Sequence, residues 1–154
     1  MELNIDKCKI LLLSRVSPVV YSFAIEIDGV HRILDRGTKM KDLGVQIDEK
    51  LKFGVHIHEK VNKAYSTLGL IKRNFKYMDK ETFVNLYKAL VRSHLEYASS
   101  VWSPHAIVQT EEVEKMQKRA TKLVHDCNRL SYSDRLKYLN LPTLRFRRRL
   151  VEAT

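Results

Sequence analysis

The longest regular pattern of apolar positions lies between residues 81 and 102, where apolar side chains recur every three or four positions. This spacing predicts one long α-helix over residues 81–102 with a single apolar face. Asp79 is suited to cap its first turn, and Pro104 is typical of a residue just beyond a helix end. The apolar face consists of Phe83, Leu86, Tyr87, Leu90, Val91, Leu95, Ala98 and Val101.

The first fifty residues have the pattern of β-strands. Residues 21–27 alternate between apolar and smaller or polar side chains, and residues 30–34 can return beside them. Asp28 and Gly29 between the two stretches favour the positive φ angles of a tight turn, so we expect a β-hairpin here. Residues 8–13 form a further compact apolar run.

Two glycines suggest further features of this β-rich part. Arg36 and Gly37 are typical of a second turn. Residues 40–47 form another extended run that contains Gly44. A glycine inside a strand indicates a bulge or a close approach by another backbone or a ligand.

From about residue 55 the apolar period becomes helical. We expect helices over residues 55–75, 81–102 and 110–127, a short one capped by Ser131, Ser133 or Asp134, and a last one capped by Thr143. The predicted fold is therefore α+β, with a small antiparallel β segment over residues 1–54 and a helical bundle over residues 55–154.

Charge changes this picture, because Lys and Arg outnumber Asp and Glu by 28 to 18 and the net charge is +10. Between residues 115 and 149 the only acids are Asp126 and Asp134. This concentration favours an anionic partner, most often nucleic acid and less often a membrane surface. A solvated helix face without a partner explains the charge about equally well. The basic residues there are Lys115, Lys118, Arg119, Lys122, Arg129, Arg135, Lys137, Arg145, Arg147, Arg148 and Arg149.

Enzymatic chemistry has little support in the sequence. Phosphate-binding glycine motifs and a gathered set of carboxylates are absent, and His56 and His58 have no obvious third metal ligand. Aromatic residues could stack on nucleic-acid bases, although Tyr97 and Trp102 lie on or beside the apolar stripe and are expected in the core. The candidates for stacking are Tyr65, Tyr77, Tyr97, Trp102, Tyr132 and Tyr138.

Several motifs together resemble one protein family. Residues 90–104, LVRSHLEYASSVWSP, closely resemble the thumb region of reverse transcriptases from jockey-like retrotransposons without long terminal repeats, with Ser93 in place of the usual proline. Further segments resemble these enzymes in register, so the resemblance covers essentially the whole chain. They are Asn4 and Lys7 of the fourth palm motif, residues 42–45 of the primer grip, and residues 68–75, 113–120, 130–132, 139–144 and 147–149.

The resemblance implies that the chain comprises the tail of the palm, the primer grip and the thumb, which hold an RNA/DNA template–primer hybrid. Gly44 would allow the primer-grip strand to approach the primer end. The residues expected to contact nucleic acid are Lys7, Leu43, Gly44, Lys115, Lys118, Arg119, Lys122, Arg147 and Arg148.

The resemblance also implies what is missing. In the intact family, catalytic aspartates upstream of the fourth palm motif bind two Mg²⁺ ions, and this sequence has no such aspartate-containing turn before Asn4. We therefore expect a truncated copy of an element, or a sequence that starts inside one. This chain alone is expected to have no catalytic residues, no metal site or cofactor, and no polymerase activity.

Two alternatives to nucleic-acid binding stay open. Strands without their upstream partners could present an open sheet edge that binds the missing fingers and palm, another protein or a second copy of the chain. The chain could also be a truncated element product without a function. We expect an intracellular protein, in the cytoplasm or nucleus, because Cys8 and Cys127 form no motif and no apolar run is long enough to span a membrane.

Overall fold

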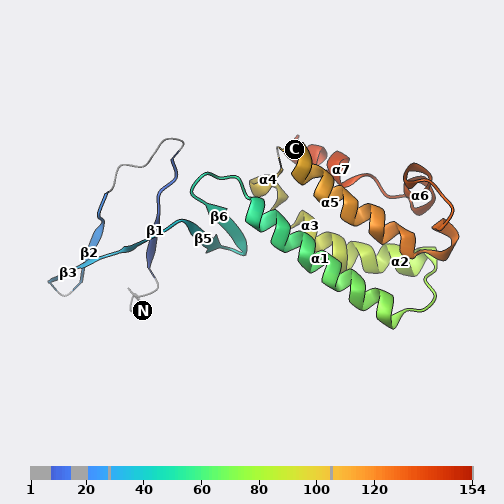
Figure 1. Cartoon of the computed structure of the whole chain (residues 1–154), viewed down its shortest axis with the longest axis horizontal. Helices are drawn as coiled ribbons and strands as arrows, with labels where there is room; N and C mark the ends of the chain where they lie inside the picture. The colour runs from blue at the N-terminus through green and yellow to red at the C-terminus, as the bar shows by residue number, and fades with distance from the viewer. Residues whose placement is uncertain (1–7, 15–20, 28, 105, 154) are drawn as a thin grey trace. The chain divides into compact units, whose positions relative to one another are not determined.

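The computed structural model describes residues 8–14, 21–27, 29–104 and 106–153. It divides the chain into two compact units, Met1–Phe53 and Gly54–Thr154, which we call the β unit and the helical unit (Figure 1). The predicted α+β class is confirmed, because short strands occupy the first unit and helices the second. The predicted motif residues Asn4 and Lys7 lie outside the described residues.

The predicted hairpin of the β unit is confirmed. Strand β2 (Ala24–Ile27) pairs antiparallel with β3 (Val30–Ile33), and Ile27 lies opposite Val30. Gly29 in the connection has a φ of +74°, which a residue without a side chain adopts at little cost. Asp28, the other predicted turn residue, is outside the described part of the chain.

The predicted extended run over residues 40–47 is wrong, because the chain reverses in its middle. Strand β5 (Lys39–Asp42) pairs antiparallel with β6 (Val45–Asp48), and Asp42 lies opposite Val45. Leu43 and Gly44 form the two-residue turn, with φ angles of +43° and +81°. Positive φ at both positions matches the twist of a tight hairpin, so Gly44 is a turn residue and not a glycine within a strand.

The predicted turn at Arg36 and Gly37 is also wrong. These residues belong to strand β4 (Asp35–Gly37), which pairs with β1 (Lys9–Leu11). This pair is parallel, whereas the sequence analysis expected only antiparallel strands. Parallel partners are connected through a long crossover, and the pattern of neighbouring residues does not reveal such a partner.

A carboxylate organises the end of the β unit. Asp48 accepts hydrogen bonds from the backbone N–H groups of Lys50, Lys52 and Phe53, at 3.0, 3.2 and 2.8 Å. Burial raises the pKa of Asp48, but these N–H groups outweigh it and hold the pKa below its usual value of 3.8. The Asp48 carboxylate therefore stabilises a loop in which Leu51 and Phe53 both have positive φ.

The helical unit begins with α1 (Gly54–Asn74), the longest helix of the described chain (Figure 1). The other elements are α2 (Lys80–Leu86), the π-helix η2 (Tyr87–Arg92), α3 (Ser93–Glu96), α4 (Ser99–Trp102), α5 (Ile107–Ala120), the 3₁₀ turns η3 (Thr121–Leu123) and η4 (His125–Cys127), α6 (Tyr132–Leu139) and α7 (Leu144–Glu152). The predicted caps at Asp79 and Thr143 are confirmed, and Ser131 is the cap among the three candidates for α6, since each of these side chains accepts a first-turn backbone N–H.

The predicted helix over residues 81–102 is interrupted. Tyr97 leaves the helical conformation and Ala98 has a positive φ of +52°, so α3 ends and α4 starts in a new direction. The buried indole of Trp102 donates a 2.7 Å hydrogen bond to the Tyr97 carbonyl, which satisfies a group that the break removes from the helix. Trp102 is in the core as predicted, but the break leaves Tyr97 53% exposed, so its predicted place in the core is wrong.

The predicted helix over residues 110–127 is wrong at both ends, because α5 begins at Ile107 and ends at Ala120. Arg135 stabilises this end from α6. Its guanidinium is buried and donates to the Thr121 hydroxyl at 3.0 Å and to the Leu130 carbonyl at 2.8 Å. The side chain from a later helix thus fixes a C-terminus that no local glycine or proline marks.

A polar link crosses the core of the helical unit. Gln117 is 1% exposed and accepts a 2.7 Å hydrogen bond from the Tyr87 hydroxyl. Its amide also donates to the Pro142 carbonyl at 2.9 Å. The link therefore joins η2, α5 and the segment before α7 in one fixed arrangement.

Candidate nucleic-acid interface

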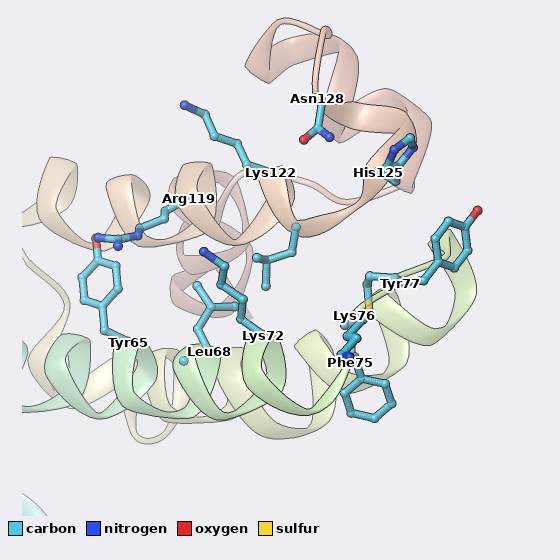
Figure 2. A pocket seen from close by; sticks show the side chains of 13 residues that line it. Tyr65, Leu68, Lys72, Phe75, Lys76, Tyr77, Arg119, Lys122, His125 and Asn128 are labelled. Carbon is cyan, nitrogen blue, oxygen red and sulfur yellow. The ribbon is translucent and has the colours of Figure 1, made fainter.

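A groove of about 560 Å³ runs between the second half of α1 and the end of α5 (Figure 2). We call it the basic groove. Tyr65, Leu68, Gly69 and Lys72 line one side, because positions spaced by three, four and seven lie on one helix face. The other side and the ends are formed by Phe75, Lys76, Tyr77, Met78, Arg119, Lys122, Leu123, His125 and Asn128.

The charge of this groove has one sign. Lys72 and Lys76 lie on the α1 side, and Arg119 and Lys122 lie on the α5 side, with the Lys122 side chain extending away from α1 (Figure 2). None of the described residues that line the groove carries a carboxylate. Four like charges in one groove raise the positive potential there, which attracts an anion.

Aromatic rings flank these cations. The Arg119 guanidinium lies over the Tyr65 ring, 5.5 Å from its centroid. Tyr77 and His125 form a tilted ring pair with centroids 6.1 Å apart. Tyr77 is 67% exposed and Phe75 is 41% exposed, so their faces are accessible to a flat partner such as a base.

The structure separates the predicted basic stripe of α5. Arg119 and Lys122 line the basic groove, whereas Lys118 places its ammonium 5.3 Å from the Tyr132 ring centroid. Lys115 is exposed and is not among the residues that line the groove. Only half of the predicted stripe therefore converges on this surface.

Arg147 and Arg148 do not extend the basic groove. Arg147 binds the Glu96 carboxylate with both Nε and a terminal nitrogen, at 2.5 and 3.3 Å. The hydrogen bond to Glu96 raises the pKa of Arg147. Arg148 is only 6% exposed. Arg147 is thus paired with a carboxylate and Arg148 is largely buried, and their contact with nucleic acid stays a prediction.

Comparisons with known proteins point to a mobile element. The chain is 28% identical over 120 residues to the probable RNA-directed DNA polymerase from transposon BS of Drosophila melanogaster, across 75% of this chain and 13% of that protein. The chain is a distant relative of a transposon reverse transcriptase. It is also 29% identical over 113 residues to an uncharacterized Caenorhabditis elegans protein, across 71% of this chain and 57% of that one.

The similarity covers only part of the length of each of these two relatives. The chain spans about half of the worm protein and about an eighth of the transposon polymerase. No family model matches the chain, and no solved structure matches it significantly. The relationship is therefore to part of a larger protein.

The residues that the sequence analysis compared with a primer grip belong to the β unit. Leu43 is 83% exposed at the tip of the β5–β6 hairpin, beside Gly44. Lys7 is outside the described residues. These predicted contacts and the basic groove therefore belong to separate units.

Sequence analysis missed half of the cations in the basic groove. Lys72 and Lys76 were not predicted as binding residues, and neither were His125 and Asn128. One signal was available, because Tyr65, Lys72 and Leu68 share a helix face. The sequence alone does not show that α5 lies beside this face, so it could not identify the face as one side of a groove.

The histidines considered for metal binding have other surroundings. His56 is fully buried, with its ring 5.4 Å from that of Trp102, and His58 forms a 3.1 Å contact with Glu112. Within the described residues, no group of three or more His, Cys, Asp or Glu side chains is placed to hold a metal ion. A search of the same residues finds no helix with the length and hydrophobicity needed to cross a membrane.

Proposed function

We propose that the helical unit binds the sugar–phosphate backbone of nucleic acid, as the thumb-like part of a reverse transcriptase from a jockey-like retrotransposon without long terminal repeats. The observation that carries the proposal is the basic groove, with four cations and no carboxylate among its described lining residues. The distant relationship to a transposon RNA-directed DNA polymerase supports the same partner.

The expected mode of binding follows from the side chains. Lys72, Arg119 and Lys122 would pair with successive phosphates, and the counterions released from the nucleic acid would drive association. Phe75 and Tyr77 would stack on unpaired bases at the end of the groove. The interaction is therefore independent of sequence and weakens as salt rises. Lys115 and Lys118 would contribute at the edge of the footprint.

The test is fluorescence anisotropy of a labelled RNA/DNA template–primer hybrid over a salt series. A triple variant, Lys72→Glu, Arg119→Glu and Lys122→Glu, should lower the slope of log affinity against log salt by about 3. The matched control changes Lys63, Lys88 and Arg129 to Glu, because all three are exposed and lie outside the groove. Equal losses in both triples would show that only net charge matters and would overturn the proposed groove.

Single-stranded substrates test the aromatic part separately. A Phe75→Leu and Tyr77→Leu variant should weaken binding of a single strand by about 1–3 kcal/mol per stacked base, since leucine offers no π face. Binding of a blunt hybrid should change much less. If both substrates respond alike, the aromatic residues support the fold of the groove and do not stack on bases.

We expect no nucleotide incorporation by this chain alone, because two-metal phosphoryl transfer needs several carboxylates at one site. The chain would hold a template–primer without making bonds, and Mg²⁺ would belong to the catalytic part of a larger enzyme. A primer-extension assay with Mg²⁺ tests this. Extension that survives removal of contaminating polymerases would refute it.

A second candidate function is protein binding by the β unit. Within its described residues each sheet has two strands, and Phe23, Val30 and Ile33 are 45%, 56% and 75% exposed. Such open edges favour a third strand from the rest of a polymerase, another protein or a second copy. Salt separates the candidates, because an apolar edge contact persists in high salt whereas phosphate binding fades.

A further inference from the structure

A second cavity of about 300 Å³ lies in the helical unit, where the start of α5 meets α7. Arg145, Arg148 and Arg149 line it, together with Ser103, Thr110 and Glu111. None of these residues lines the basic groove. We call this cavity the arginine pocket.

The convergence of three arginines follows from their spacing. Positions 145, 148 and 149 are separated by three and four residues, so they lie on one face of α7. Arg147 lies off this face and binds Glu96. Glu96 and Arg147 do not line the arginine pocket, so their salt bridge does not enter the charge of its lining.

The burial of Arg148 increases the effect of its charge. Its side chain is 94% buried, since the residue is only 6% exposed, and charges interact more strongly where water is excluded. Glu111 supplies the one carboxylate among the described residues that line the pocket. Three guanidinium groups against one carboxylate give the lining a net charge of +2.

The backbone beside the pocket adds a weaker preference for an anion. Helix α5 begins here, and its N-cap residue, Ala106, provides no side-chain hydrogen bond to the first turn. The Thr110 hydroxyl is directed to the carbonyls of Pro104 and Ala106, at 3.3 and 3.2 Å. Because Ile107, Thr110 and Glu111 at the start of α5 line the pocket, the positive end of the helix dipole lies at this cavity and adds a weak preference for an anion.

We propose that the arginine pocket binds a phosphate group. A phosphate dianion balances the +2 charge of the lining, and its tetrahedral oxygens suit the planar two-pronged donors of arginine better than a single carboxylate does. The group is either free phosphate or the terminal phosphate of a nucleic-acid strand. The proposal does not depend on the basic groove, because the two sites share no residue.

Thermal denaturation of the whole chain with inorganic phosphate, against sodium chloride of equal ionic strength, tests the pocket. Phosphate should raise the Tm more than chloride does, because a ligand specific to the folded state stabilises it. An Arg145→Gln and Arg149→Gln double variant should weaken phosphate binding at least about tenfold, since it removes two charge-assisted contacts. Both residues are exposed, so this variant should fold.

Two further variants make the test specific. Glu111→Gln should tighten phosphate binding several-fold, because it removes the opposing carboxylate. Arg129→Gln, an exposed change outside both cavities, should leave binding unchanged. If phosphate and chloride act alike, or if the double variant responds like the wild type, the proposal is overturned.

A final comparison identifies the source of the phosphate. If the pocket holds a strand end, an oligonucleotide with a 5′- or 3′-phosphate should bind about tenfold more tightly than its hydroxyl counterpart, and the double variant should lose that preference. Equal affinities, with inorganic phosphate still bound through Arg145 and Arg149, would identify free phosphate. The Lys72, Arg119 and Lys122 triple variant should retain phosphate binding, which separates this result from failure of the basic groove.

Discussion

The two units of the chain are stabilised in different ways. Among the described residues of the helical unit, twenty hydrophobic side chains are buried, including Trp102, Tyr87 and Phe83. In the described part of the β unit, Val45 is the only buried side chain. Since burial of apolar surface is the main favourable contribution to folding, the helical unit can sustain a fold by itself.

The β unit depends instead on local geometry. Hairpins, one parallel pair and the Asp48 loop set its shape, and two-stranded sheets without a covered face are marginally stable in water. Tyr21, Phe23 and Ile33 are exposed, so their burial contributes little. The contrast teaches that the helical unit has a core of its own that can support a binding site, whereas the described apolar side chains of the β unit are largely exposed and stabilise it little.

The largest expected effect separates the two units directly. Trp102→Ala should lower the free energy of unfolding by about 3–5 kcal/mol, because it empties a core position that is 1% exposed. Ile33→Ala, at a position 75% exposed in β3, should change it by less than about 0.5 kcal/mol. Urea denaturation followed by circular dichroism measures both. Comparable losses would mean that the β unit is also covered in solution.

The next effect concerns the polar link in the helical core. Gln117→Leu should cost about 2–4 kcal/mol, because the Tyr87 hydroxyl and the Pro142 carbonyl both lose a buried partner. Adding Tyr87→Phe removes the hydroxyl that has lost its hydrogen-bond partner, so the double variant should be more stable than the sum of the two single changes predicts. A double-mutant cycle in urea measures this. Strict additivity would show that the hydroxyl and the amide act independently.

Features of the fold that depend on neighbouring residues could be predicted from the sequence, whereas features that depend on contacts between distant residues could not. Asp79, Ser131 and Thr143 were predicted as caps because a cap is a local interaction. The break at Ala98 was missed because neither glycine nor proline marks it. The Trp102 indole and the surrounding packing stabilise this conformation, and the apolar pattern does not record them.

The site shows the same division. Arg119 and Lys122 were predicted from the charge pattern of one helix, whereas Lys72 and Lys76 were not, because their role depends on α1 lying beside α5. Conversely, Arg147 was a predicted contact, but the structure pairs it with Glu96, 51 residues earlier in the chain. A charge pattern identifies cations, and only tertiary contacts show which of them are accessible.

A smaller effect on stability is expected from the pH dependence of the Asp48 loop in the β unit. The folded pKa of Asp48 is lower than its usual value of 3.8, so its contribution is fully present above that value and is lost as pH falls through the folded pKa. The protection factors of the Lys50, Lys52 and Phe53 amides, which are corrected for the pH dependence of intrinsic exchange, should therefore fall below about pH 4. Asp48→Asn should cost about 1 kcal/mol at neutral pH and remove this pH dependence. Protection factors that stay unchanged down to pH 2 would contradict the role of the carboxylate.

The smallest effect lies at the tip of the β5–β6 hairpin. Leu43 has a φ of +43°, a conformation that costs a leucine energy and that asparagine adopts readily. Leu43→Asn creates an Asn-Gly turn and should stabilise the hairpin by about 0.5–1 kcal/mol, and the lost leucine contributes little because it is 83% exposed. Leu43→Ala is the control, since alanine keeps the backbone strain and should give no gain. Amide exchange across β5 and β6 measures the difference. If asparagine gives no protection, contacts of the leucine side chain stabilise the turn, and the β unit is less dependent on local geometry than its exposed side chains indicate.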